Sequence, residues 1–194
     1  TNISLQGLKK MQSIIKNKQK CIFIGIHQSN WEILPSIVEK IGFNIVIVYR
    51  HINNNFIDTH ILKKRMKCIK SKNSFFTPKG NKSAKDIIYG LNKKLSILIL
   101  IDQKDSAGKN IKLFNYETKT QTGFVKIAKK HNLKIIPIQN IRKRANKFKI
   151  IFHSPVKYNK KDSEEKIMLK IHKIIENWII QNPNQWFWQH NRFN

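Results

Sequence analysis

The sequence has few acidic residues, few cysteines and no long apolar run, and each shortage excludes a class of protein. Only 11 residues are Asp or Glu against 38 Lys and Arg, so the formal net charge of +27 favours a polyanionic partner: an anionic membrane, nucleic acid or an acidic protein. The two cysteines, Cys21 and Cys68, have no metal-ligand spacing, which argues against a disulfide scaffold and indicates a reducing compartment. No apolar run approaches the roughly 18 residues of a bilayer-spanning helix.

A chain of 194 residues is long enough for one well-buried core, and we expect a single domain over residues 1–194. Short apolar runs alternate with stretches whose apolar residues recur three or four apart, which predicts an α/β sandwich with a largely parallel, mixed sheet flanked by helices. The predicted strands are 21–26, 45–49, 96–101, 133–139 and 148–152. The predicted helices are 5–16, 30–41, 56–66, 83–92, 123–131 and 163–180, and residues 102–122 are predicted to form a long loop.

The most informative segment runs from Ile22 to Glu32, where an apolar strand ends, a turn follows and a helix begins. Catalytic groups and ligands gather at such carboxyl ends of strands in open α/β sheets. On one regular helix His27 and Glu32 would diverge by about 140°, whereas a junction between a turn and a helix can bring them together. A carboxylate against one imidazole nitrogen fixes the tautomer and leaves the other nitrogen to take a proton from a hydroxyl, which is general-base chemistry without a protein nucleophile.

The same segment also has a purely structural interpretation. Ser29-Asn-Trp-Glu32 matches the S-x-x-E capping box, in which Glu32 serves only to fix the start of a helix. His27 would then be an ordinary residue at a strand end. The segment alone leaves both interpretations open.

Several motifs together resemble one family. The H-x4-E spacing from His27 to Glu32 is the signature of glycerolipid acyltransferases, and with Asn30-Trp31 it resembles the late acyltransferases of bacterial lipid A biosynthesis, the lauroyl/myristoyl transferase family. Other segments are similar to those of that family and follow in the same order over residues 20–193, so the resemblance is more specific than the spacing alone. They are Tyr49-Arg50, Asn55-Phe-Ile-Asp58, Phe76-Thr-Pro-Lys-Gly80, Asp102-Gln103, Thr122-Gly123 and the stretch from Pro183 to Phe193 that holds Trp186, Trp188, His190 and Arg192.

The resemblance implies an enzyme that moves a fatty acyl group from a thioester, on acyl carrier protein or coenzyme A, to a hydroxyl of a lipid A precursor or a related membrane lipid. In that reaction His27 is the general base and Glu32 orients it, and neither an acyl-enzyme, a cofactor nor a metal ion is expected. The expected location is the cytoplasmic face of the bacterial inner membrane, with peripheral contact to anionic lipid. The family's N-terminal membrane segment is absent and the chain begins at Thr1 inside a helical pattern, so we expect an upstream anchor to be missing.

Four further residues are expected to bind substrate. Arg50 follows a strand, where it can bind a phosphate of the acceptor or the developing oxyanion; a surface salt bridge is the alternative. Asp102 also follows a strand and can orient Arg50 or position substrate, or it can be a turn residue. Lys79 and Gly80 form a turn that can present an ammonium and backbone N–H groups to an anionic head group.

The aromatic residues near the end of the chain have two possible uses. Trp186, Phe187, Trp188 and Phe193 are suited to a membrane interface, but packing against the sheet is the favoured interpretation. His190 is expected to be structural, because nothing else marks it as a base.

Three other functions remain as alternatives. A nucleic-acid-binding module would use the large positive charge, but no nucleic-acid partner is expected because recognisable motifs of such modules are missing. A lysophospholipid or other glycerolipid acyltransferase would share the chemistry with a different acceptor. An inactive homologue would bind lipid without turnover.

Overall fold

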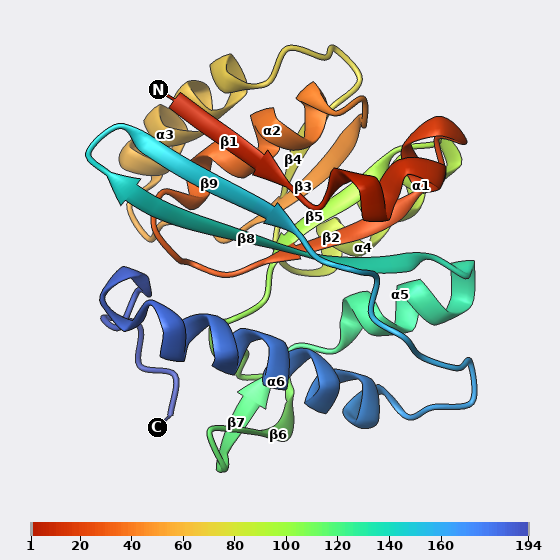
Figure 1. Ribbon diagram of the computed structural model, residues 1–194, viewed down its shortest axis with the longest axis vertical. Helices are drawn as coiled ribbons and strands as arrows, with labels where there is room; N and C mark the ends of the chain where they lie inside the picture. The colour runs from red at the N-terminus through yellow and green to blue at the C-terminus, as the bar shows by residue number, and fades with distance from the viewer. Residues whose placement is uncertain (1, 194) are drawn as a thin grey trace.

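Residues 2–193, the part of the chain that the computed structural model describes, form a central seven-stranded sheet with helices on both faces and a small two-stranded sheet beside it (Figure 1). The strands are β1 (Asn2–Gln6), β2 (Cys21–Gly25), β3 (Ile45–Tyr49), β4 (Phe75–Pro78), β5 (Ser96–Leu100), β6 (Lys109–Leu113), β7 (Tyr116–Thr120), β8 (Lys134–Arg144) and β9 (Lys147–Phe152). The helices are α1 (Gln12–Lys16), α2 (Leu34–Lys40), α3 (Asn55–Cys68), α4 (Asn81–Asn92), α5 (Gly123–His131) and α6 (Glu164–Gln181), with short 3-10 helices η1 (Leu8–Met11), η2 (Trp31–Ile33) and η3 (Pro183–Gln185).

The strand order of the central sheet is β1-β9-β8-β2-β5-β3-β4. Neighbouring strands run parallel except β8 and β9, which form an antiparallel pair. Parallel strands are covered on both faces, which explains why the inner strands β2, β3 and β5 are almost entirely apolar and buried. The predicted fold class, an α/β sandwich with a largely parallel mixed sheet flanked by helices, is confirmed.

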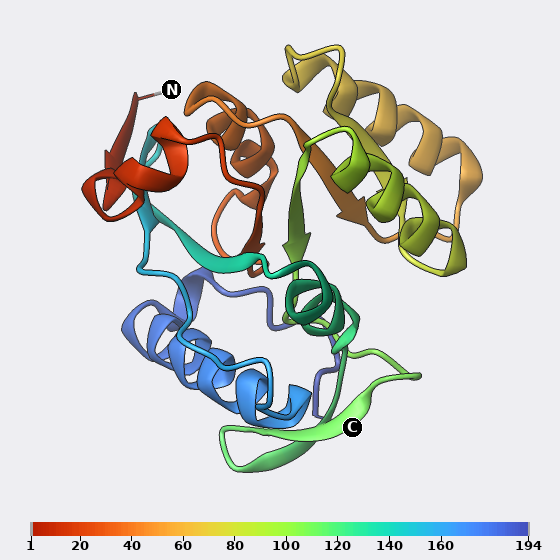
Figure 2. The same ribbon diagram turned by 90° about the vertical axis from the view of Figure 1, so that its right-hand side faces the viewer.

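Each face of the sheet has its own apolar core, and the view turned by 90° shows helices on either side of the strands (Figure 2). Leu91 of α4, Phe124 of α5 and Ile171 of α6 pack on one face. Ile14 of α1 and Leu34 of α2 pack on the other. The strands between them hold the two layers at a fixed spacing, so the ends of the strands form a rigid edge.

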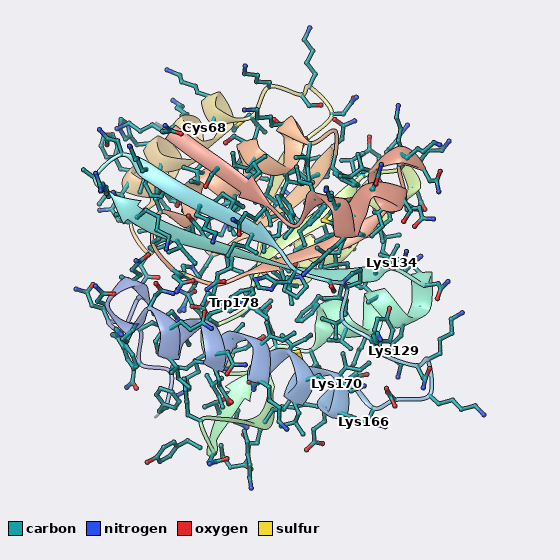
Figure 3. The ribbon with its side chains drawn as sticks, viewed as in Figure 1. Cys68, Lys129, Lys134, Lys166, Lys170 and Trp178 are labelled. Atoms are coloured by element: carbon teal, nitrogen blue, oxygen red, sulfur yellow. The ribbon has the colours of Figure 1, made fainter. Side chains whose placement is uncertain are left out.

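Helix α6 closes the larger core. It begins where Ser163 Oγ accepts the Lys166 N–H over 3.1 Å. Trp178 is buried between the helix and the sheet, whereas Lys166 and Lys170 reach out from its first turns (Figure 3). Within the described residues, no helix is both long enough and apolar enough to cross a membrane.

The carboxyl ends of four parallel strands meet at one edge of the sheet. Gly25 at the end of β2 is level with Leu100 at the end of β5, and Tyr49 at the end of β3 is level with Pro78 at the end of β4. Since β2, β5, β3 and β4 are neighbours in that order, the segments that follow them lie next to one another. Those segments hold four of the predicted site residues: His27, Asp102, Arg50 and Lys79.

The predicted helix over residues 5–16 is wrong at its start, whereas Leu8–Met11 forms the 3-10 helix η1, which leads into α1. Residues Asn2–Gln6 form β1, which pairs in parallel with β9 at the edge of the sheet, and only Gln12–Lys16 is α-helical. Gly7 lies between β1 and η1 with φ at 82°, and a Cβ there would collide with the carbonyl oxygen of Phe152. The close approach of the chain to β9, which the local pattern does not reveal, overrides the helical period.

The predicted loop over residues 102–122 contains a β-hairpin. Strands β6 and β7 pair antiparallel, and their buried side chains alternate with exposed ones. The inward residues of β7 are Thr118 and Thr120, and Thr118 Oγ1 donates to the Ile111 carbonyl over 2.8 Å. Because these buried residues are polar, the alternation of apolar and polar residues is hidden in the sequence. The short strand β4 was likewise not predicted.

We predict that His172 makes the fold acid-sensitive. Its ring on α6 is buried, its Nδ1 donates to the Lys112 carbonyl over 2.7 Å, and its Nε2 has no partner within the described residues. Burial lowers the pKa of His172 from 6.5 to about 4. The unfolded chain therefore binds this proton first, so stability present at pH 7 falls as the pH drops from 6.5 towards 4, by about 3 kcal/mol from this group.

Urea unfolding of the wild type and of His172→Leu at pH 7 and pH 4 measures this difference. The variant should lose the part of the acid destabilisation that His172 contributes, whereas His60→Leu, at an exposed position of α3, should keep it. An equal loss of stability in the wild type and in His172→Leu would contradict the prediction.

Candidate functional site

His27 and Asp102 lie side by side where β2 and β5 end. Gly25 and Leu100 are paired across these two parallel strands, so the residues two positions further along each chain meet. His27 Nδ1 is 2.7 Å from Oδ1 of Asp102, and the backbone N–H of His27 donates to Oδ2 over 3.0 Å. The register of the sheet thus brings an imidazole and a carboxylate into direct contact.

The Asp102 carboxylate is 2% exposed and accepts a third hydrogen bond from Nε1 of Trp186 over 2.8 Å. Burial alone would raise its pKa, but the charge and hydrogen bonds of His27 and the Trp186 indole hold the pKa of Asp102 below its ordinary value. Because an ionised carboxylate only accepts hydrogen bonds, Nδ1 of His27 carries a proton, and in the neutral ring the lone pair is therefore on Nε2. Among the described residues, no group is hydrogen-bonded to that Nε2.

A closing segment, residues 183–193, fixes the loop that carries His27. The Phe187 N–H donates to the His27 carbonyl over 2.9 Å, and the Ser29 N–H donates to the Gln185 carbonyl over 2.7 Å. Between these two bonds Trp186 turns inward to reach Asp102. The imidazole therefore has its backbone, as well as its ring, held in place.

The aromatic side chains of the closing segment have different surroundings. Trp186 is buried in the core, so the expected packing against the sheet is confirmed for this residue. The ring of Phe187 lies 6.4 Å from that of His27 and 5.8 Å from that of Trp31, centroid to centroid. Trp188 and Phe193 are 55% and 36% exposed. The rings of Phe187 and Trp31 thus shield the His27 imidazole from solvent.

We expected Glu32 to contact His27, but it does not. Its carboxylate forms a two-pronged ion pair with Arg65 of α3, with Nε to Oε2 at 2.9 Å and Nη2 to Oε1 at 2.5 Å. Burial would lower the pKa of Arg65, but the hydrogen bonds and charge of Glu32 outweigh it and raise that pKa. The capping box is not formed either, because Ser29 Oγ has no partner within the described residues. Glu32 sits on η2, and its side chain turns towards α3 rather than back to the β2 end.

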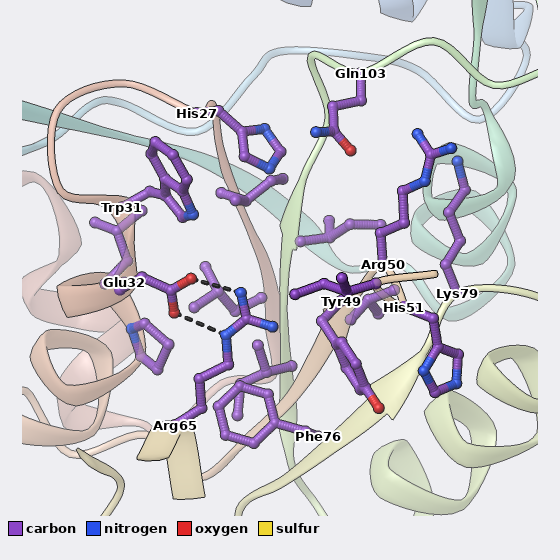
Figure 4. Close-up of a pocket in the computed structure, with 18 of the residues that line it drawn as sticks. His27, Trp31, Glu32, Tyr49, Arg50, His51, Arg65, Phe76, Lys79 and Gln103 are labelled. Carbon is purple, nitrogen blue, oxygen red and sulfur yellow. Dashed lines mark hydrogen bonds and ion pairs between the residues drawn. The ribbon is translucent and has the colours of Figure 1, made fainter. Parts of the chain in front are cut away.

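A cavity of about 350 Å³ opens beside the imidazole (Figure 4). Its rim carries His27, Gln103, Arg50 and Lys79, and the Glu32–Arg65 pair forms part of one wall. Its inner surface is apolar and is built from side chains of α2, β3, β4 and β5, namely Leu34, Pro35, Ile47, Phe76, Leu98 and Leu100. The arrangement joins a base and several cations to an apolar recess.

Arg50, Lys79 and Gly80 were predicted to bind substrate. Arg50 and Lys79 line the cavity, but Gly80 does not. Arg50 makes no hydrogen bond or ion pair within the described residues, so the expected alternative of a surface salt bridge is not what the structure contains. Lys79 Nζ is 3.3 Å from Asp105, and its N–H donates to the Tyr49 carbonyl over 2.7 Å. The Gly80 N–H lies 3.3 Å from Ser83 Oγ at the start of α4, which makes this glycine part of a helix cap.

Two remaining polar residues of the closing segment have structural partners. His190 Nε2 accepts the Lys104 N–H over 2.8 Å, in agreement with its expected structural use. Arg192 is buried and donates to the Lys119 carbonyl and to Thr120 Oγ1, and burial lowers its pKa to about 10. Among the described residues, no cluster of His, Cys, Asp and Glu is arranged to hold a metal ion.

The sequence did not predict two features of the site. Asp102 was expected to contact Arg50 or substrate, and its pairing with His27 was missed because it depends on β2 and β5 being neighbours. Arg65 was not singled out, although it is one of only five arginines in a lysine-rich chain. A planar two-pronged donor is not interchangeable with lysine, so the scarcity of arginine was the available signal.

Comparison with known proteins gives one family and one fold. The family model described as bacterial lipid A biosynthesis acyltransferase matches residues 1–194. The crystal structure of the 1-acyl-sn-glycerophosphate acyltransferase PlsC from Thermotoga maritima is similar, with a TM-score of 0.52 and 14% sequence identity over 96% of this chain and 74% of that one. No curated protein matches this chain in sequence.

We predict that the His27 imidazole exists as the Nδ1–H tautomer, because its partner is an ionised carboxylate. Nitrogen-15 NMR of selectively labelled histidine should show a protonated Nδ1 and a bare Nε2 for the neutral form of this ring. Asp102→Asn should weaken that preference, since an amide can also donate a hydrogen bond. Glu32→Gln should leave the tautomer unchanged, and a shift of the His27 signals in Glu32→Gln rather than Asp102→Asn would contradict the geometry described above.

Proposed function

Because this chain belongs to the bacterial lipid A biosynthesis acyltransferase family and is therefore an acyltransferase, we propose that it moves a fatty acyl group from a thioester to a hydroxyl of a lipid A precursor. The donor in this proposal is an acyl carrier protein or coenzyme A, and the acceptor is an anionic membrane lipid. The proposed place of the reaction is the cytoplasmic face of the bacterial inner membrane. No cofactor and no metal ion enters the proposed chemistry.

One observation carries the proposal: a histidine with a bare Nε2 and a carboxylate-bound Nδ1 stands at the mouth of an apolar cavity. A hydroxyl needs a base to attack a thioester, and a fatty acyl chain needs an apolar recess. A buried carboxylate stabilises the imidazolium that forms when His27 takes a proton. Base and recess are adjacent, which supports acyl transfer to a hydroxyl without a protein nucleophile.

In the proposed reaction, Nε2 of His27 takes up a proton and later gives it back. His27 Nε2 removes the proton of the acceptor hydroxyl as its oxygen attacks the thioester carbonyl carbon. The resulting tetrahedral oxyanion collapses, the carbon–sulfur bond breaks, and the departing sulfur takes the proton back from Nε2. Arg50, on the rim and free of partners within the described residues, is suited to the oxyanion or to a phosphate of the acceptor.

The two carboxylates have different proposed roles. Asp102 orients His27 and stabilises its charge, because it holds both the ring and the backbone of that residue. Glu32 fixes the Arg65 guanidinium in the cavity wall, where it acts on the position of substrate rather than on the base. Glu32 as the orienting partner of His27, which the motif spacing suggested, stays the alternative.

A glycerolipid acceptor is a second candidate. The fold is similar to that of an enzyme whose name gives 1-acyl-sn-glycerophosphate as its substrate, and both acceptors are lipids that carry phosphate. The rim residues Arg50 and Lys79 suit either one. A panel of purified acceptors, with lipid A precursor and lysophosphatidate compared at equal concentration, separates the two.

We predict that His27 and Asp102 act as a unit. Release of free thiol from an acylated carrier protein in the presence of a lipid A precursor should fall by at least roughly a thousandfold in His27→Ala and in Asp102→Asn, the latter because the amide does not hold the reactive tautomer. Glu32→Gln should cost far less, about tenfold. His27→Ala with Asp102→Asn should be hardly worse than either alone.

Circular dichroism and thermal unfolding check that all of these variants are folded. A loss in Glu32→Gln as large as in His27→Ala, with full activity in Asp102→Asn, would return the orienting role to Glu32. Salt-sensitive DNA binding in a wild type that releases no thiol would instead favour a nucleic-acid-binding module. Lipid binding without turnover would indicate an inactive homologue.

We predict that Leu98 limits the length of the acyl chain. It lies on β5 two residues before Leu100, about 7 Å deeper in the sheet from the end that carries Asp102, and both side chains line the cavity. Leu98→Phe should reduce kcat/KM for long-chain donors relative to short-chain donors by roughly tenfold, because the ring fills the inner end of the recess. An unchanged chain-length profile in a folded, active variant would show that the acyl chain lies elsewhere.

A further inference from the structure

Two exposed apolar side chains stand at the first turn of α3. Phe56 is 82% exposed and Ile57 is 45% exposed. They follow β3 by a short connection whose residues His51 and Ile52 line the cavity. The apolar turn therefore lies close to the cavity lining, within about 14 Å of Ile52 along the chain even if the connection were fully extended.

Hydrogen bonds fix this turn to two residues that line the cavity. Asn54 Oδ1 accepts the N–H of Phe56 over 3.0 Å and that of Ile57 over 3.2 Å. The buried Asp58 accepts the Ile52 N–H over 3.0 Å and lies 2.7 Å from Nδ1 of His51. Phe56 and Ile57 thus do not lie on a loose loop. They project from a helix start that hydrogen bonds hold in a fixed position relative to the cavity.

Beyond its first turn, the outer face of α3 carries several lysines. Lys63 and Lys67 fall within about 40° of Phe56 around the helix axis, and they are exposed, as is Lys64. The acidic residue of this helix, Asp58, is buried and turned towards His51. We define the α3 face as Phe56, Ile57, Lys63, Lys64 and Lys67.

We propose that the α3 face docks onto an anionic phospholipid bilayer, with Phe56 and Ile57 inserted between the lipids and the lysines at the head groups. An apolar tip on a lysine-rich helix suits the membrane interface, where the rings meet acyl chains and the ammonium groups meet phosphates. A partner held by charge alone would use the lysines but leave Phe56 in water. The inference rests on the proposed function only in that docking would hold the cavity mouth against its lipid acceptor.

The chain offers a direct test with a fluorescent probe. In a Cys68→Ser background, where Cys21 is buried, an environment-sensitive dye on a cysteine replacing Phe56 reports entry into lipid. Its emission should rise and shift to the blue with vesicles of phosphatidylglycerol and phosphatidylethanolamine, and hardly at all with phosphatidylcholine alone. The matched control is the same dye in place of Ile180, which is 65% exposed at the end of α6 and should not respond. No response at position 56, or an equal response at both, would overturn the proposal.

Vesicle co-sedimentation provides the second measurement. Phe56→Asp with Ile57→Asp should weaken binding to the anionic vesicles by roughly tenfold or more, whereas Ile180→Asp should not, with all variants checked for an unchanged melting temperature. Thiol release on a detergent-dispersed acceptor should survive in the double variant, because it does not touch the His27 unit. Wild-type binding to these vesicles in a protein that lacks activity would defeat the proposed function alone, and undiminished binding by the double variant would defeat docking through α3. Loss of binding to an acidic carrier protein, with vesicle binding intact, would assign the face to a protein partner instead.

Discussion

The buried carboxylate of Asp102 is the constraint on which the rest of the site depends. An ion removed from water costs several kcal/mol unless its oxygens are satisfied, and here three donors satisfy them: the ring and backbone of His27 and the indole of Trp186. The carboxylate and its donors come from three distant parts of the chain, so the carboxylate is stable only when β2, β5 and the closing segment are assembled together. Folding and formation of the base are therefore one event.

Two carboxylates near one histidine take different positions because their surroundings differ. Asp102 lies at the end of a buried strand, level with His27 through the sheet register, and its ion-pair partner among the described residues is the imidazole. Glu32 lies on η2, where the Arg65 guanidinium from α3 offers it two parallel hydrogen bonds. A bidentate arginine is a stronger partner for an exposed carboxylate than an imidazole already engaged elsewhere, which explains why the sequence-adjacent acid is not the one that touches the base.

Periodicity predicted what depends on local sequence, and it missed what depends on neighbours in space. Runs of apolar residues located β2, β3 and β5, and the 3.6-residue period located α5 and α6 closely. β1 and the β6–β7 hairpin escaped, the first because pairing with β9 overrides a helical pattern, the second because buried threonines interrupt the apolar alternation. His27, Arg50 and Asp102 were recognised as strand-end residues, but strand order decides which of them touch, and one sequence does not contain it.

The hydrogen bonds between the closing segment and the His27 loop also have a consequence for the order of synthesis. A nascent chain whose closing segment still lies inside the exit tunnel has β2, β5 and both of their polar ends, but it has neither the Trp186 indole nor the Phe187 amide. Its Asp102 lacks a donor and its His27 loop lacks an anchor. A newly made molecule thus acquires a fully held His27 only once the closing segment has emerged and packed against the ends of β2 and β5.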